Sequence, residues 1–90
     1  MPTLNGLASS RNGGRPNLKT LDMLARGEQA RICAVSGDDA VAVRLMEMGL
    51  VEGQPIENLG AAPLGDPVEY LVCGYRLSLR LSEARRVEVV

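Results

Sequence analysis

The sequence feature that most constrains the fold is a pair of alternating apolar segments, residues 68–72 and 75–81, with two residues between them. Every second side chain of a β-strand points to the same face of its sheet. The residues that share the apolar face are Val68, Tyr70 and Val72 in the first segment and Tyr75, Leu77, Leu79 and Leu81 in the second. Cys73-Gly74 suits a tight two-residue turn, so this region predicts an antiparallel hairpin.

Other short segments also have the patterns of strands and turns. The remaining predicted strands are residues 29–35, 54–59 and 87–90. In the first of them we expect one face to carry Ala30, Ile32 and Ala34. Pro55 should lie at a strand start or a sheet edge, because proline cannot donate a ladder hydrogen bond. Residues 60–67 are rich in glycine, proline and alanine and predict a loop.

Two short helical turns and one longer helix complete the prediction. The short turns are residues 20–25, with Thr20 as N-cap and Gly27 closing the turn, and residues 82–84, with Ser82 as N-cap. The longer helix is predicted over residues 39–48, after an acidic start at Asp38 and Asp39. Gly49 suits the left-handed residue that ends a helix, with Leu50 packing back on Leu45.

These elements predict a mainly β fold, a small and partly open SH3-like antiparallel barrel of about five strands. One α-helix crosses it, and short helical turns connect its strands. A chain of 90 residues has room for a single hydrophobic core. We expect that core in one domain, residues 18–90. Residues 1–17 lack an apolar period and predict a flexible tail.

The composition argues against a metal centre, a cofactor and catalysis. The chain has no histidine, and its two cysteines, Cys33 and Cys73, are far apart in the sequence. Two isolated thiols do not supply the three or four ligands of a zinc or iron site. Ser78 has no histidine to activate it. We therefore expect no metal site, no cofactor, no catalytic residue and no enzymatic activity.

The charge distribution favours a protein partner over a nucleic acid. Residues 38–70 carry seven acidic side chains against a single arginine, and both ends of the chain are basic. Nucleic-acid grooves need a dominant basic face and aromatic side chains for stacking, whereas this chain has two tyrosines. The sequence has no secretory signal and no apolar run of about 20 residues, so we expect a cytoplasmic protein without direct membrane insertion.

Three motifs in a fixed order resemble those of a known family. They are RLMEMGL at residues 44–50, PLGDP at 63–67, and GYRLSLR at 74–80 followed by Glu83-Ala84. In this spacing they resemble the FeoA family, the small cytosolic component of bacterial ferrous iron uptake, over residues 19–90. The resemblance implies an SH3-like barrel that modulates FeoB, the membrane permease with a cytosolic GTPase part. Without histidine, this chain is poorly equipped to carry iron itself.

The predicted helix offers a candidate partner-binding face. At 100° per residue, Val41, Leu45 and Met48 form one stripe, which we assign to the core. The opposite side combines apolar and charged residues, which are Val43, Arg44, Met46, Glu47 and Leu50. An exposed apolar helix face often marks a protein contact. Alternatively, the turn that carries Leu21, Met23 and Leu24 folds over this face.

Arg76 and Arg80 are the other candidate contact residues, since they share the face of a strand opposite its leucines. They could meet an acidic partner or a phosphate, or they could simply be solvated. The leading hypothesis is a cytosolic regulator that binds FeoB. One alternative is a GTPase-activating factor that uses Arg44, Arg76 or Arg80 as an arginine finger. Another is a stand-alone SH3-like peptide-binding adaptor, for which only Tyr70 and Tyr75 could line a groove.

Overall fold

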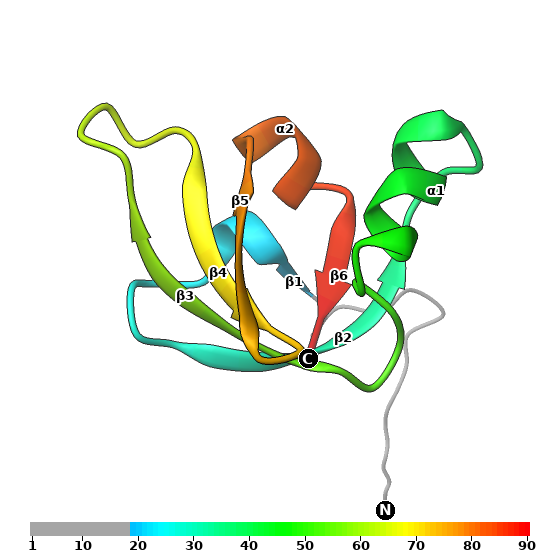
Figure 1. Ribbon diagram of the computed structural model, residues 1–90, viewed down its shortest axis with the longest axis horizontal. Coiled ribbons are helices and arrows are strands. Elements are labelled where there is room, and N and C mark those ends of the chain that lie inside the picture. The colour runs from blue at the N-terminus through cyan, green and yellow to red at the C-terminus, as the bar shows by residue number, and fades with distance from the viewer. Residues whose placement is uncertain (1–18) are drawn as a thin grey trace, which may run out of the picture.

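The computed structural model describes residues 19–90, which form a bent antiparallel sheet with three short helical segments (Figure 1). The strands are β1 (Lys19–Thr20), β2 (Gln29–Val35), β3 (Pro55–Ala61), β4 (Val68–Val72), β5 (Tyr75–Leu79) and β6 (Val87–Val89). The helical segments are the 3-10 helix η1 (Leu21–Met23) and the α-helices α1 (Ala40–Glu47) and α2 (Leu81–Ala84). The prediction of a flexible tail over residues 1–17 lies outside the described residues.

The strand order is β1-β6-β2-β3-β4-β5, and each neighbouring pair is antiparallel. Strands β1 and β5 end this order and do not pair with each other within residues 19–90. The predicted mainly β, partly open barrel is confirmed, with six strands in place of about five. Strand β1 was missed because two residues are too few to show an alternating pattern.

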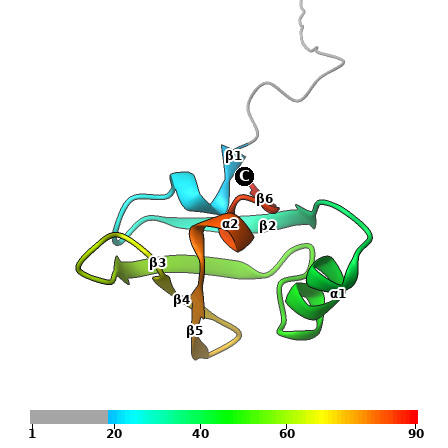
Figure 2. The ribbon, with the colours of Figure 1, turned by 90° about the horizontal axis from the view of Figure 1, so that it is seen from above.

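The first and last strands of the described chain lie side by side. Lys19 of β1 pairs with Val89 of β6, and Thr20 pairs with Glu88. Figure 2 shows β1 and the C-terminal end at one edge of the sheet and β5 at the opposite edge. Both ends of the folded unit therefore leave it from the same region.

The predicted hairpin is present as β4 and β5, with Val68 opposite Leu79 and Val72 opposite Tyr75. Cys73 and Gly74 form its turn with φ angles of 54° and 81°. Two successive residues with positive φ match the twist of a two-residue hairpin, which explains why this turn was predictable.

The alternation of β2 is interrupted, contrary to the prediction. Ile32 is buried, but Ala34 is exposed, and Val35 packs against the core instead. The pairing of β2 with β6 shifts its register between Ile32 and Ala34. An extra residue in one strand reverses the faces of the side chains that follow it. The expectation that Ala34 shares the face of Ile32 is therefore wrong.

The core lies inside the bent sheet and is closed at one end by η1. Its largest fully buried side chain is that of Tyr70. The Tyr70 hydroxyl donates to the Leu21 carbonyl at 3.4 Å, and Leu21 is itself fully buried. Segment η1 packs on α2 and β6. The alternative in which this turn covers the outer face of the longer helix is therefore wrong.

Asn58 of β3 is a buried polar residue that links η1 to the sheet. Its side-chain amide nitrogen donates to the Leu24 carbonyl at 2.8 Å, and its side-chain oxygen accepts from the Gly60 main-chain N–H at 2.7 Å. Both polar atoms of the amide are thus satisfied away from water, as a buried polar group requires.

Both predicted caps of the short helical turns differ from the structure. Thr20 precedes η1 but bonds through its hydroxyl to the Asp22 carboxylate and caps no main-chain amide. Helix α2 begins one residue before Ser82, at Leu81, with Arg80 as its N-cap residue. The Arg80 main-chain N–H donates to the Glu83 carboxylate at 2.9 Å. That carboxylate stabilises the helix start from its third residue, the role expected of glutamate in a capping box.

Candidate functional site

Helix α1 has well-defined ends that fix which of its faces is exposed. At its start, the Asp39 carboxylate accepts the Ala42 main-chain N–H at 3.2 Å and forms an ion pair with Arg86. The hydrogen bond from Arg86, followed by that from the Ala42 amide, lowers the pKa of Asp39. Asp39 is therefore an anionic N-cap that also ties α1 to the residue before β6.

At the end of α1, the predicted Schellman motif is confirmed. Gly49 has a φ of 102°. Its N–H donates to the Met46 carbonyl at 3.0 Å, and the Leu50 N–H donates to the Leu45 carbonyl at 3.2 Å. These two bonds satisfy carbonyls that the helix leaves open, and they turn the chain back toward the sheet.

The two sides of α1 correspond only in part to the predicted stripes. Ala42 and Leu45 are buried, whereas Val43 and Met46 are 45% and 42% exposed. Leu50 was expected on the outer face but is 0% exposed. Its direction was extrapolated at 100° per residue beyond the helix end, where the Schellman turn folds it into the core. Leu50 is therefore removed from the candidate contact residues.

The remaining predicted residues of this helix are Val43, Arg44, Met46 and Glu47, which we call the α1 face. All four are exposed. Arg44 forms an ion pair with Glu83 of α2, the residue that also accepts the Arg80 amide. The apolar part of the α1 face thus lies beside an ion pair that links the two helices.

The C-terminal end of α1 is fastened to the β4–β5 hairpin. The Tyr75 hydroxyl donates to the Met48 carbonyl. A Cβ atom built on Gly49 would lie 3.2 Å from both Cys73 Sγ and Tyr75 Oη. Tyr75, expected on the inner face of its strand, is half exposed because it stands beside the turn. The sequence named Tyr75 only as a groove-lining residue of the adaptor alternative and did not predict its contact with the end of α1.

Arg76 lies in β5, whereas Arg80, expected on the same strand face, lies one residue beyond β5 as the N-cap residue of α2. The side chain of Arg76 is 73% exposed and lies 4.0 Å from the Glu69 carboxylate, a weak surface pair. Arg80 is exposed, and its guanidinium has no ion pair within residues 19–90. The remaining predicted site residues are therefore the α1 face, Arg76 in β5 and Arg80 at the start of α2. Tyr75 and Glu83 connect these elements.

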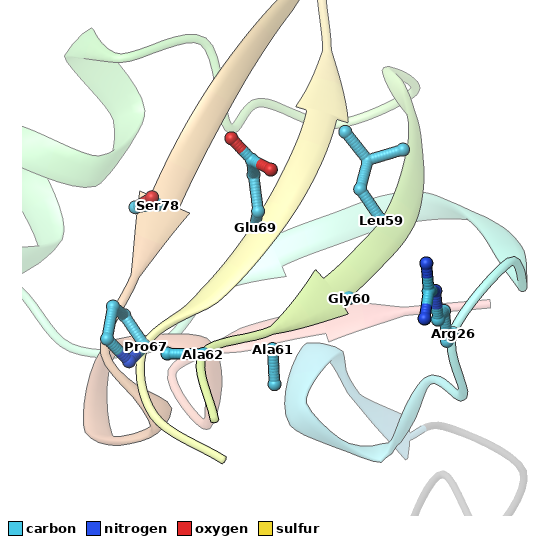
Figure 3. A pocket seen from close by; sticks show the side chains of 8 residues that line it. All are labelled: Arg26, Leu59, Gly60, Ala61, Ala62, Pro67, Glu69 and Ser78. Carbon is cyan, nitrogen blue, oxygen red and sulfur yellow. The ribbon is translucent and has the colours of Figure 1, made fainter. Parts of the chain in front are cut away.

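A shallow pocket of about 350 Å³ lies elsewhere, at the base of the β3–β4 loop. It is lined by Arg26, Leu59, Gly60, Ala61, Ala62, Pro67, Glu69 and Ser78. Figure 3 shows Arg26 at one end of the pocket and Ser78 at the other, with Glu69 between them. No histidine exists to activate Ser78. The lining therefore holds one guanidinium and one carboxylate without a nucleophile–base pair.

Residues 19–90 contain neither a cluster of metal ligands nor a membrane-spanning helix. Within residues 19–90, no three histidine, cysteine, aspartate or glutamate side chains come close enough together to hold a metal ion. Cys33 is half-buried and Cys73 exposed, and both are free thiols. No helix of the described chain has the length and apolar character required to cross a bilayer.

The FeoA domain family model matches residues 19–90. A fusion of Fe(2+) transport protein A with the Fe(2+) transporter FeoB from Porphyromonas gingivalis is 42% identical over 69 residues. This match covers 77% of the chain but 8% of the fusion protein. The chain therefore spans less than a tenth of that relative.

Solved structures give the same result. An FeoA-like protein from Clostridium acetobutylicum is 33% identical with a TM-score of 0.77, and the match covers 81% of this chain and 85% of that one. FeoA of Stenotrophomonas maltophilia, described as a prokaryotic SH3 domain protein and solved with zinc, is 36% identical with a TM-score of 0.71. This match covers 79% and 88% of the two chains. From its motifs, its fold and these relatives, the chain belongs to the FeoA domain family.

Proposed function

We propose that this protein is a cytoplasmic accessory factor of bacterial ferrous iron uptake that acts by binding a FeoB-type permease. The observation that carries the proposal is the Porphyromonas gingivalis relative, which is a fusion of Fe(2+) transport protein A with FeoB. A covalent linker holds two modules at high effective concentration, an arrangement that benefits modules that touch each other. The separate chain would make the same contact by diffusion.

The α1 face is the surface that suits this contact best. Val43 and Met46 expose apolar area on a helix that is anchored at both ends, at Asp39 and at Met48. Methionine adapts its shape to a partner surface, and charged residues such as Arg44 and Glu47 suit the rim of an interface. A helix that is already fixed loses little conformational entropy on binding.

Binding, rather than chemistry or cofactor loading, is the proposed mode of action. Within residues 19–90 no side-chain cluster could hold a metal ion, and the lining of the pocket beside Arg26 holds no nucleophile–base pair. The partner is the cytosolic part of the permease, which makes the protein cytoplasmic and requires neither a nucleic acid nor insertion into the membrane. Its effect on the permease arises from surface complementarity.

The test is a binding titration of the full chain against a detergent-solubilised FeoB-type permease. We expect saturable binding in the range of about 10–100 μM, as for transient contacts. Met46→Glu should weaken it by at least about tenfold, since it places a charge within the apolar contact. Met23→Glu is the matched control, because Met23 is exposed on η1 away from the α1 face. Absence of saturable binding, or equal losses with both variants, contradicts the proposal.

A second candidate function is stimulation of GTP hydrolysis by an arginine finger. Arg80 suits this role better than Arg44, because Arg80 is exposed and has no ion pair within residues 19–90, whereas Arg44 is paired with Glu83. Turnover of the permease should then rise on addition of the protein and lose that rise with Arg80→Lys, which keeps the charge but lacks the planar fork. Unchanged turnover with Arg80→Lys and Arg76→Lys removes this candidate.

The peptide-binding adaptor has no support in the geometry. Tyr70 is fully buried, and Tyr75 is the sole other aromatic residue of the chain. Proline-rich ligands dock in grooves lined by several aromatic side chains. A groove of that kind cannot be built from one half-exposed tyrosine.

A further inference from the structure

Strand β5 is an open edge of the sheet. It pairs with β4 on one side, and no other strand of residues 19–90 pairs with it on the other side. Figures 1 and 2 show β5 at one end of the sheet, with its C-terminal end leading into α2. An edge strand presents a row of free N–H and C=O groups, which can pair with another chain.

The hairpin register identifies which main-chain groups are free. In a two-residue hairpin, the residues that flank the turn form a hydrogen-bonded pair, here Val72 and Tyr75. Alternation along the ladder makes Leu77 and Leu79 the next bonded residues. The N–H and C=O groups of Arg76 and Ser78 therefore point away from β4, and no hydrogen bond to another element engages them within the described chain.

The side chains along this edge select the kind of strand that would fit. Arg76 and Ser78 are exposed on one face of β5, and Arg80, which has no ion pair within residues 19–90, follows them. On the opposite face, Leu77 is partly buried against the core and Tyr75 is half exposed. An added strand would place alternate side chains beside these two faces. Acidic residues suit the arginine face, and apolar residues suit the leucine face.

Charge also disfavours a second copy of this chain as the occupant. Antiparallel pairing of two β5 edges would bring Arg76 and Arg80 from both copies to the same seam. Charged side chains on an edge strand are a common means of preventing such self-pairing. A partner segment that carries the opposite charge has no such penalty.

We propose that the β5 edge, meaning the outward main-chain groups of Arg76 and Ser78 with the neighbouring Arg80, binds an extended partner segment of alternating acidic and apolar residues as an additional strand. The proposal rests on the function above in one respect, that the segment belongs to the FeoB-type permease. Main-chain hydrogen bonds would supply affinity, and the alternating side chains would supply specificity.

The first arm of the test uses the permease itself. Ser78→Pro removes an outward N–H without removing a ladder bond to β4, so the fold should persist. Ser78→Ala is the matched control because it keeps the N–H. We expect Ser78→Pro to weaken permease binding by about tenfold and Ser78→Ala to leave it unchanged. Urea unfolding of both variants checks that they are folded.

The second arm uses the unaltered full chain and a short acetylated and amidated peptide of alternating glutamate and valine. In the free chain, the amides of Arg76 and Ser78 should exchange rapidly with solvent when followed by NMR. Saturating peptide should reduce both exchange rates by at least about tenfold. The same peptide with lysine in place of glutamate should protect neither amide. This arm requires no variant, so it stands if Ser78→Pro does not fold.

The outcomes separate the two proposals. If Met46→Glu weakens permease binding and Ser78→Pro does not, the β5-edge proposal is overturned and the proposed function remains intact. Protection of both amides by the glutamate peptide without any permease binding supports the edge and contradicts the proposed function. Amides that are already slow in the free chain show that a second copy or another part of the chain occupies the edge, and this result overturns the inference.

Discussion

The Tyr75 hydroxyl donates a hydrogen bond to the Met48 carbonyl and so fastens the end of α1 to the start of β5. Gly49 follows directly and lies against the same hairpin, next to Cys73. At the other end of the helix, Asp39 is paired with Arg86. Helix α1 is therefore fixed to two separate parts of the chain, which holds its exposed face in one orientation.

Gly49→Ala should destabilise the protein more than Gly53→Ala. Both glycines have positive φ angles, 102° and 89°, where alanine costs about 1–2 kcal/mol. A Cβ at Gly53 meets nothing within 4 Å, whereas one at Gly49 lies 3.2 Å from two side-chain atoms. We expect a further cost of about 1–2 kcal/mol at Gly49 from this crowding. Equal urea midpoints for the two variants would contradict this prediction, because they would show that the Cys73 and Tyr75 side chains move aside without cost.

Asp39→Ala should lower stability at neutral pH, whereas Asp38→Ala should not. Asp39 caps α1 and pairs with Arg86, and Asp38 does neither. Because the folded-state pKa of Asp39 is lowered, its contribution is present above the ordinary value of 3.8 and is lost as pH falls through the folded pKa. Thermal unfolding at neutral and acidic pH measures this. A difference between the variants that persists in strong acid contradicts the assignment.

Tyr70 should make the protein less stable at alkaline pH. Burial, followed by the nearby Asp22 carboxylate, raises the pKa of its hydroxyl from 10.0 to about 12. The folded state then holds the proton more tightly than the unfolded state, so stability is level below about pH 10 and falls between about pH 10 and 12, by up to about 2 kcal/mol. Urea unfolding of wild type and Tyr70→Phe across this range should show the decline in wild type alone.

Asn58→Ala should be more damaging than a surface substitution. It would leave the Leu24 carbonyl and the Gly60 amide without the side-chain partners they have in the structure. We expect a loss of about 2–4 kcal/mol, since each buried unsatisfied group costs about 1–3 kcal/mol. Gln29→Ala is the control, because Gln29 is exposed and makes one weak side-chain bond, 3.3 Å to Glu57. Similar losses in both variants would argue against a buried polar link.

The elements with local signals were predictable from the sequence. Period-two alternation and a turn dipeptide that accepts positive φ predict the β4–β5 hairpin. The acidic N-cap and Gly49 predict the start and the end of α1. The exposure of Val43 and Met46 followed from helical periodicity within α1.

The features that depend on distant parts of the chain were not predictable. Ala34 is exposed because β6 pairs with β2 through a shifted register. Asn58 is buried because η1 covers it with a carbonyl from a segment far away in the sequence. No pattern within a short window records such contacts. For the site, the sequence supplied α1 and the arginines but not the contacts of Tyr75 and Glu83, which connect them.

The pairing of Lys19 with Val89 bears on how such a module can be joined to other proteins. A tether attached at the first or the last described residue would start beside β1 and β6, at the edge of the sheet opposite β5 (Figure 2). Gene fusion could therefore attach a neighbour at either end while the open strand remains turned toward a docking surface.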